Sequence, residues 1–257
     1  MSTIQAENAT LDREADVATG SIHLSLQGKG GVGKSLIASI LAQYFRQKGH
    51  DVQCIDTDPV NQTLAQYQAL RAQHLELLQD GQVDQRRFDV LLERILTEEA
   101  VFVVDSGAST FIPLWNYLLE NDVMQVLRQA HKRLYVHTVV TGGQALLDTL
   151  KGFRSLADST SDRNLIVWIN EYFGRVEYAG KTFEQMQAYE LSKDKVFGSV
   201  QITKRNNDTF GRDIHDVITS KLTFEEAIRD GAFSLMAKQR LRVVQRDLFE
   251  QIDRLGF

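Results

Sequence analysis

The stretch "SLQGKGGVGKSLIASI", residues 25–40, contains two overlapping phosphate-binding patterns. From Gly28 onward, G-x-G-x-x-G is the dinucleotide fingerprint of dehydrogenases, whereas G-x-x-x-x-G-K-S over 28–35 is the P-loop of nucleoside triphosphatases. In both patterns, glycines let backbone N–H groups turn around phosphate oxygens at the start of a helix. The glycines alone therefore do not decide which nucleotide the chain binds.

Polar residues around these glycines favour a triphosphate. The lysine at Lys34 would reach the β- and γ-phosphates, and the hydroxyl of Ser35 would ligate Mg²⁺. The apolar run that ends at Asp105 has the form of a Walker B strand, whose carboxylate lies beside that metal. Asp56 alone would also suit a ribose-binding dehydrogenase, but Asp58 follows it on the same edge of the predicted sheet. Three carboxylates fit a triphosphate with Mg²⁺ and an attacking water, and they would repel a bare pyrophosphate.

Strand-like and helix-like segments alternate outward from the P-loop. We predict helices over 34–48 (with Gly49 as its C-terminal cap), 85–96 and 234–255. We predict strands at 22–27, 52–56, 100–105, 133–140, 164–170 and 196–202. Several of these strands are apolar without alternation, which indicates burial on both faces. The expected fold is therefore α/β, with a mostly parallel β-sheet flanked by helices on both faces.

Composition limits the class of protein. The 257 residues suit one P-loop ATPase domain over 21–257 after a flexible polar tail at 1–20. Cys54 is the only cysteine, which excludes internal disulfides and fits a reducing cytosol. The net charge of −5 provides no strong nucleic-acid signal. No signal peptide and no transmembrane segment are visible, so we expect a cytoplasmic protein.

Lys29 adds a positive charge that a P-loop does not require. It is either a solvated side chain or a group that stabilises charge during γ-phosphate transfer, as an arginine finger does. A side chain on the outer wall of the loop points away from its own γ-phosphate. Lys29 could therefore reach the nucleotide of a second subunit.

The stretches "GKGGVGKS" (28–35), "DTDP" (56–59) and "VWIN" (167–170), with the strand that ends at Asp105, resemble the deviant Walker A ATPases of the ParA/MinD family. The resemblance implies ATP or ADP with Mg²⁺ as cofactors. The P-loop residues expected to bind the nucleotide are Gly28, Lys29, Gly30, Gly31, Val32, Gly33, Lys34, Ser35 and Leu36. Those expected at the metal are Ser35, Asp56 and Asp105.

The resemblance also implies roles for residues outside the P-loop pattern. Lys29 is expected to cross the interface of an ATP-sandwiched dimer, and Asp58 to orient the attacking water. Asn170, at the end of a late strand, is expected to contact adenine. With Lys34 at the phosphates, the expected catalytic residues are Lys29, Lys34 and Asp58.

Other stretches, "HTVVTGGQALLDT" (137–149), "TFEQMQAY" (182–189) and "GRDIHD" (211–216), resemble proteins of conjugative plasmid transfer within that family. This resemblance implies a nucleotide-dependent homodimer that works with a conjugation or type IV secretion component. One departure is Ser109, which stands where the family usually has a flexible glycine after the Walker B strand. Another is Thr203 followed by lysine, where a proline beside adenine is common.

Three kinds of function fit these observations. The first is a slowly hydrolysing ATPase that changes partners between its ATP and ADP states. The second is a small-molecule kinase or ATP-dependent ligase on the same fold, which would need a substrate pocket beyond the γ-phosphate. The third is a binding module that holds nucleotide for stability. Release of ADP and free phosphate without another substrate separates the first from the second.

Two glycine-containing segments remain. The glycines in Thr141-Gly142-Gly143 are expected to form a tight strand-to-helix turn, although a second phosphate site at that helix is conceivable. Residues 171–186, immediately after Asn170, are aromatic and are expected to form a lid over the base or a partner-binding loop.

Overall fold

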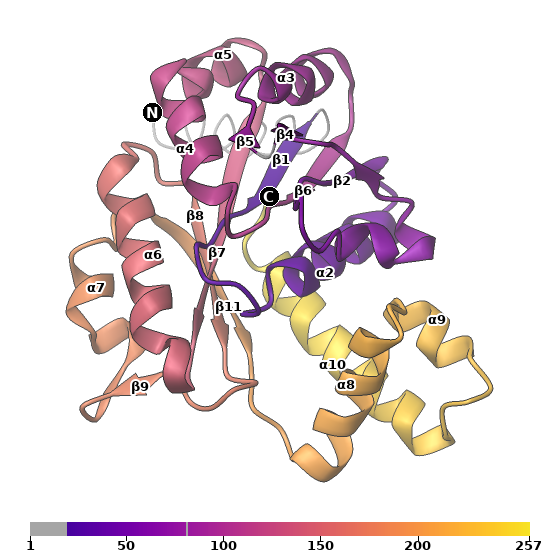
Figure 1. Ribbon diagram of the computed structural model, residues 1–257. Coiled ribbons are helices and arrows are strands. Elements are labelled where there is room, and N and C mark those ends of the chain that lie inside the picture. Colours follow the sequence, from indigo (N-terminus) through magenta and orange to yellow (C-terminus); the bar gives the residue numbers. More distant parts are fainter. Residues whose placement is uncertain (1–19, 81) are drawn as a thin grey trace, which may run out of the picture.

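The computed structural model describes residues 20–80 and 82–257 (Figure 1). The tail predicted at 1–20 lies outside the described residues, apart from the buried Gly20. The described residues contain one seven-stranded sheet with helices on both sides.

The sheet has the strand order β11-β8-β7-β1-β6-β2-β3, and every pair of neighbouring strands is parallel. The bounds are β1 Ser21–Ser25, β2 Val52–Asp56, β3 Gln73–His74, β6 Val101–Asp105, β7 Arg133–Thr141, β8 Leu165–Asn170 and β11 Val196–Ile202. The parallel sheet expected from the apolar runs is thus confirmed. The first strand ends two residues earlier than predicted, because the side chain of Gln27 already bonds to Val139 O (2.8 Å) and Thr149 O (3.1 Å) in the turn toward the P-loop.

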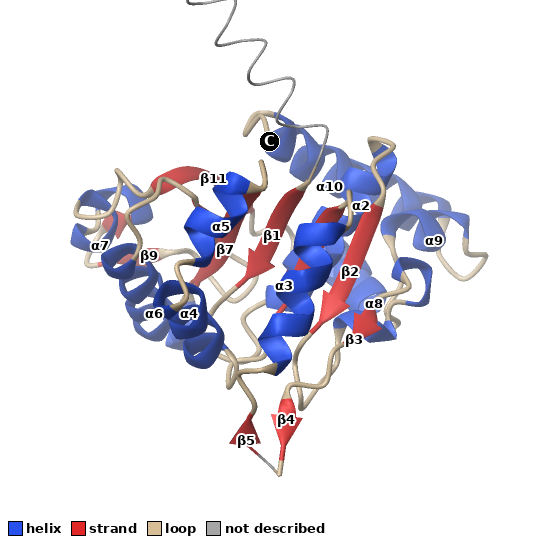
Figure 2. Ribbon diagram, turned by 90° about the horizontal axis from the view of Figure 1, so that it is seen from above, coloured by secondary structure: helices blue, strands red, loops and turns tan. Residues whose placement is uncertain are grey.

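Helices cover both faces of the sheet (Figure 2). One face packs against α2 Lys34–Gln47, α8 Arg212–Thr219, α9 Phe224–Arg229 and α10 Leu235–Asp253. The other packs against α3 Arg87–Thr97, α4 Phe111–Glu120, α5 Val123–Gln129, α6 Leu146–Ser159 and α7 Gln187–Glu190. Two short hairpins lie outside this sheet: β4 Leu78–Gln79 with β5 Gln82–Val83, and β9 Glu177–Tyr178 with β10 Lys181–Thr182. The remaining described elements are the short 3-10 helices η1 Leu64–Gln66, η2 Gln68–Leu70, η3 Gly143–Ala145 and η4 Phe183–Gln185 and the π-helical turn η5 Asn207–Gly211.

The C-terminal helix α10 packs into the core, as its apolar stripe predicts. Leu241, Val244, Leu248 and Ile252 are all buried against the α2 face. Each such side chain contributes roughly 1.5–3 kcal/mol when removed from water. Within residues 20–80 and 82–257, no helix is long and apolar enough to cross a membrane.

A chain of polar side chains crosses the buried middle of the sheet. Trp168 Nε1 donates to His137 Nδ1 (2.9 Å), His137 Nε2 lies 2.9 Å from His23 Nδ1, and His23 Nε2 lies 2.9 Å from Ser21 Oγ. Indole N–H is only a donor, so each histidine is neutral with its proton on Nε2, and each passes a hydrogen bond to the next group. Burial lowers the pKa of His137 to about 3 and holds the pKa of His23 well below its usual value.

All the parallel strands end at one edge of the sheet, where α/β folds bind ligands. The P-loop follows β1 at this edge, the "DTDP" segment follows β2, and Asn170 ends β8. The topology therefore brings together segments that are far apart in the sequence.

Candidate functional site

The P-loop joins β1 to α2 through backbone conformations that only glycine adopts readily. Gly31 has φ of 73° and Gly33 has φ of 111°. A Cβ atom at Gly33 would also lie 3.0 Å from Asn170 Nδ2. No side chain caps the N-terminus of α2. The first N–H groups of this helix are thus left without a side-chain acceptor, as an anion site at a helix N-terminus requires.

The side chain of Lys34 lies buried along the loop, and its Nζ donates to the carbonyl oxygen of Lys29 at 3.1 Å. Burial lowers the pKa of Lys34, while the charges of Asp105 and Asp58 oppose that shift. The ammonium group of Lys34 is thus held at the phosphate loop by a backbone carbonyl, and the nearby carboxylates of Asp105 and Asp58 favour its charged form.

Asp105 is a buried carboxylate whose two oxygens have no hydrogen-bond partner in the described part of the chain. It ends β6, directly opposite Asp56 in the neighbouring strand. Burial raises the pKa of Asp105 to about 7, the Ser35 hydroxyl opposes this shift, and the charge of Asp56 adds to it. Such an unsatisfied group is costly unless a cation or donor reaches it. The position therefore suits a divalent cation.

Asp56 is engaged with the backbone on both sides of its carboxylate. Its Oδ1 accepts from Asp58 N and its Oδ2 from Ala65 N, both at 3.0 Å. Burial raises its pKa, and these N–H groups act against that rise. The side chain thus fixes the loop that follows β2, and both of its carboxylate oxygens are already used by that loop.

Asp58 is only partly buried, and Oδ1 accepts from Val60 N (2.9 Å) and Asn61 N (3.2 Å). This carboxylate therefore lies at the start of a tight turn rather than inside the sheet. Gly107 packs against it so closely that a Cβ atom there would be 2.8 Å from Asp58 Oδ1. The end of β6 and the segment after β2 are thus in direct contact.

A cavity of about 690 Å³ opens over these groups. Its lining includes P-loop residues, the segment after β2 and helix α8: Gly30, Gly31, Gly33, Lys34, Ser35, Leu36, Asp58, Asn61, Thr63, Tyr67, Ser109, Asn170, Tyr172, His215 and Thr219. Its volume is in the range of small-molecule and cofactor sites. Lys34, Ser35, Asp58 and Asn170 therefore meet at one site, whereas Asp56 and Asp105 lie beneath it.

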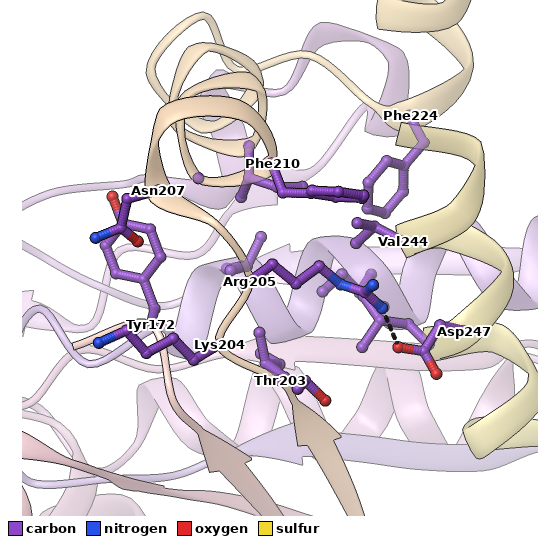
Figure 3. A pocket seen from close by; sticks show the side chains of 15 residues that line it. Tyr172, Thr203, Lys204, Arg205, Asn207, Phe210, Phe224, Val244 and Asp247 are labelled. Carbon is purple, nitrogen blue, oxygen red and sulfur yellow. Dashed lines mark hydrogen bonds and ion pairs between the residues drawn. The ribbon is translucent and has the colours of Figure 1, made fainter. Parts of the chain in front are cut away.

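A smaller apolar pocket adjoins this cavity and shares Leu36, Tyr172 and Ile202 with it (Figure 3). Phe210 covers one side, and its ring lies 5.2 Å from the guanidinium of Arg205. Figure 3 shows Arg205 reaching toward Asp247 of α10, with a distance of 2.6 Å between Nη2 and Oδ2. The pocket has a volume of only about 60 Å³, and its lining is mainly apolar apart from Lys204, Arg205 and Asp247.

Asn170 is buried at the wall between loop and pocket. Its Nδ2 donates to Val32 O at 2.9 Å, and its Oδ1 accepts from Tyr172 N at 3.0 Å. The amide of Asn170 therefore links the P-loop to the end of β8. The second N–H of Nδ2 can donate to a further acceptor. Trp168, two residues earlier, is wholly buried and lies in the core rather than at this wall.

Lys29 lies on the outer wall of the P-loop, where its Nζ pairs with Asp148 Oδ2 at 3.0 Å. A second cavity of about 450 Å³ borders this wall between the P-loop, the turn after β7 and Phe173. The turn after β7 is tight, as predicted, because a Cβ atom at Gly142 would lie 2.3 Å from Gly174 O. The charge of Lys29 is thus held on the side of the loop that faces away from the 690 Å³ cavity.

Comparison with known proteins identifies the family. The CobQ/CobB/MinD/ParA nucleotide binding domain matches residues 25–216. Two Escherichia coli proteins named Protein TraL are 47% and 45% identical over 233 residues, which cover 90% of this chain and 97% of each relative. The chain belongs to the TraL group of this nucleotide-binding family. The MinD cell division protein of Aquifex aeolicus has the same fold, with a TM-score of 0.50 and 16% identity over 90% of this chain and 97% of MinD.

Membership of the MinD/ParA family agrees with the nucleotide-binding domain expected from the P-loop. The described residues contain no group of three or more His, Cys, Asp or Glu side chains able to hold a metal ion by themselves. Mg²⁺ usually takes one or two carboxylates and completes its shell with phosphates and waters. The single unpaired carboxylate of Asp105 beside the Ser35 hydroxyl fits that pattern.

Some residues of this TraL-type site were not expected from the sequence. His215 and Thr219 of α8, with Asn61 and Tyr67 after β2, line the 690 Å³ cavity. Gln27 was also missed, although its position directly before the P-loop could have drawn attention to it. His215 lies in the stretch "GRDIHD" (211–216), which resembles conjugative transfer proteins but by itself indicates no contact with a nucleotide. Helix α8 reaches the cavity through its packing in the core on the α2 side of the sheet.

Proposed function

We propose that residues 21–257 act as one Mg-ATP-binding domain, which hydrolyses ATP slowly and alternates between a monomer and an ATP-sandwiched homodimer. The observation that most supports this proposal is the buried carboxylate of Asp105, which has no hydrogen-bond partner among the described residues and lies near Lys34 and Ser35 of the P-loop. A structural aspartate would be hydrogen-bonded, whereas this one is suited to a cation that arrives with the nucleotide.

The phosphates of ATP would bind the N–H groups from Gly30 to Leu36 at the start of α2, with Lys34 at the β- and γ-phosphates. Backbone donors and one lysine together supply positive charge where the negative charge is greatest. The adenine would lie in the 690 Å³ cavity beside Tyr172 and Ile202, with the second N–H of Asn170 at its edge. The mainly apolar pocket that adjoins the cavity there would favour a planar base over a charged substrate.

Mg²⁺ would be held by the Ser35 hydroxyl and the Asp105 carboxylate, with Asp56 behind them. When bound, it would neutralise charge on the phosphate oxygens. Asp105 would then no longer be a buried carboxylate without a partner.

Asp58 would accept a hydrogen bond from the attacking water and orient it toward the γ-phosphate. Its partial exposure and its position on the cavity wall leave the carboxylate accessible. Positioning of this kind typically contributes a factor of about 10²–10⁴ to a rate. Lys29 would exchange Asp148 for the nucleotide of a second copy, because it lies on the outer wall of the loop.

The work of this cycle would be a change of partners in the cytoplasm, with a conjugation or type IV secretion component as the partner. The resemblance to conjugative transfer proteins supports this role. A substrate-directed kinase or ligase is the alternative, and the part of the cavity between Asn61 and His215 is where a second substrate would have to fit.

The test uses Asp58→Asn, which keeps the Oδ1 acceptor for Val60 N and Asn61 N but removes the negative charge. We expect phosphate release to fall by about 100-fold or more while ATP affinity stays within about threefold. Light scattering should then give a dimer in Mg-ATP and a monomer in Mg-ADP.

Adding Lys29→Ala to Asp58→Asn should abolish the ATP dimer. The matched control is Lys193→Ala, which removes another exposed lysine with a 3.0 Å ion pair, to Glu190. A monomer in both nucleotides would overturn the sandwich and favour the substrate-directed enzyme. Unchanged phosphate release in Asp58→Asn would overturn the role of Asp58.

A further inference from the structure

A cavity of about 540 Å³ lies at the amino-terminal edge of the sheet, opposite the P-loop edge. It is formed where β7 and β8 begin, beside α5 and Phe197 of β11. In Figure 1, α5 and the start of β7 lie at the end of the sheet away from α8. The proposed nucleotide cycle uses no residue of this cavity.

The rim of the cavity is cationic although the whole chain carries a net charge of −5. Among the described residues that line it, the cations are Arg128, Lys132, Arg133 and Arg163, and the carboxylate is Asp162. The three arginines are exposed, whereas Lys132 is buried and its Nζ donates to Glu98 O at 2.6 Å. Arg128 pairs with Asp162 at 2.9 Å, and both side chains remain partly exposed. The cavity is thus a local positive site on an acidic protein, which attracts anionic groups.

The floor of the cavity is apolar. Leu127, Leu134 and Tyr135 are buried there, with the partly buried Phe197 beside them. Nucleic-acid binders instead present basic residues along an extended surface that follows the phosphates. The cavity therefore suits a peptide segment in which an apolar side chain is flanked by carboxylates. The apolar side chain would contact the floor, and the carboxylates would contact the cationic rim.

Asn164 supplies a third feature. It is 7% exposed, lines the cavity, and its Oδ1 accepts no hydrogen bond within residues 20–80 and 82–257. A buried amide oxygen without a donor is rare in proteins. A peptide backbone carries an N–H at every residue, and it could satisfy this oxygen once the Asn164 side chain turns toward the cavity, because the oxygen is otherwise shielded from solvent.

We propose that this cavity binds an acidic peptide segment of a partner protein, with an apolar side chain on the floor and carboxylates at Arg128 and Arg163. The cations attract the segment and set its direction, while the floor supplies apolar contact. The bound segment would lie at the opposite edge of the sheet from the nucleotide, so both ligands could be present at once.

The experiment uses the full chain and a fluorescein-labelled peptide, Glu-Asp-Phe-Glu-Asp-Leu, in an anisotropy titration at low ionic strength. Arg128→Ala and Arg163→Ala should each weaken binding by about two- to fivefold, and the double variant by more. The matched control Arg229→Ala removes an exposed arginine that pairs with Glu225 on α9. It should leave the affinity for the peptide unchanged. Melting temperature and ATP affinity of each variant verify that the fold is intact.

A peptide with Gln and Asn in place of the acids should not bind, and added salt should weaken binding of the acidic one. Equal affinity in the double variant would overturn the proposal. So would tighter binding of a single-stranded DNA that is lost in the same variants, since the cavity would then serve nucleic acid.

The segment that precedes β1 provides a further control, since it carries Glu7, Asp12, Glu14 and Asp16 and joins Gly20 beside Lys132. The titration is therefore repeated after these four acids are changed to their amides. Unchanged affinity supports a partner in trans. If the peptide binds only to this variant, the four acids of the same chain block the cavity in the unmodified protein, and the proposal of a partner protein is overturned.

Discussion

At the scale of the residue, Lys29 and Asp148 form an ion pair whose side chains are about half exposed. Solvent screens such a pair, so its contribution to folding is at most about 1 kcal/mol. Its importance lies in its position on the outer wall of the P-loop, where the proposed second subunit would approach. The pair holds Lys29 within its own chain, and any reach across an interface must break it.

We predict that Asp148→Asn strengthens the ATP-dependent dimer by about two- to fivefold, because the monomer no longer competes for Lys29. Sedimentation equilibrium of the Asp58→Asn background in Mg-ATP measures this constant. Glu190→Gln, which breaks the similar pair with Lys193, is the control. A weaker dimer would instead mean that Asp148 itself contributes to the interface.

At the scale of the element, the neighbouring strands β1, β7 and β8 share the hydrogen-bond chain from Ser21 through two histidines to Trp168. Each donor in this series of hydrogen bonds has one acceptor, so all of the bonds form only while both histidines are neutral. An unfolded chain would protonate both rings below their ordinary pKa near 6.5. The pairing of these strands therefore depends on pH.

We predict that the free energy of unfolding falls by about 3 kcal/mol between pH 6.5 and pH 5 through these two groups. The folded pKa values are lowered, so the stabilisation is present above pH 6.5 and is lost as pH falls toward the folded value of about 3 for His137. Urea unfolding at several pH values measures the slope. The double variant His23→Gln with His137→Gln should lose most of this slope, and an equal slope would contradict the prediction.

At the scale of the whole molecule, α8 forms part of the 690 Å³ cavity but is held from behind by α10. Asp213 of α8 accepts from Arg240 of α10 at two atoms, Nε at 2.5 Å and Nη2 at 3.2 Å. This forked geometry is the stronger form of the interaction, and the carboxylate is mostly buried. The nucleotide cavity thus depends on a contact made on the far side of its wall.

We predict that Asp213→Asn lowers the free energy of unfolding by about 1–3 kcal/mol and weakens nucleotide binding, because α8 is less firmly placed. Urea unfolding and a fluorescent-nucleotide titration measure the two effects. The control is Glu250→Gln, which removes the looser 3.9 Å pair between Glu250 and Arg246, both on α10. It should lower the free energy of unfolding by less than about 0.5 kcal/mol. Lost stability with unchanged nucleotide affinity would show that α8 does not shape the site.

Much of this protein could be predicted from local pattern. The apolar run of β2 predicted that strand to the residue, since a strand buried on both faces has a composition of its own. The bounds of β11 were also predicted to the residue, although β11 is an edge strand and most of its residues are partly or fully exposed. The P-loop was visible because its glycines serve backbone conformations, and Gly33 does have the positive φ that such a residue permits. One topological rule then placed Asp56, Asp58 and Asp105 at the same edge, and of these Asp58 lines the cavity. Asn170, which also lines it, was expected only from the family resemblance.

Tertiary structure alone decided which residues of α8 and of the segment after β2 line the 690 Å³ cavity, and it alone formed the 540 Å³ cavity at the opposite edge of the sheet. His215 reaches the nucleotide cavity, and Arg205 reaches Asp247, because α8 and α10 pack on α2 from distant parts of the chain. The side-chain oxygens of Asp105 and Asn164 named above likewise lack a partner in the described part of the chain, and no local sequence pattern predicts this. Sequence determines propensity and periodicity over a few residues, whereas the surroundings of a side chain depend on which distant segments the packed core brings beside it.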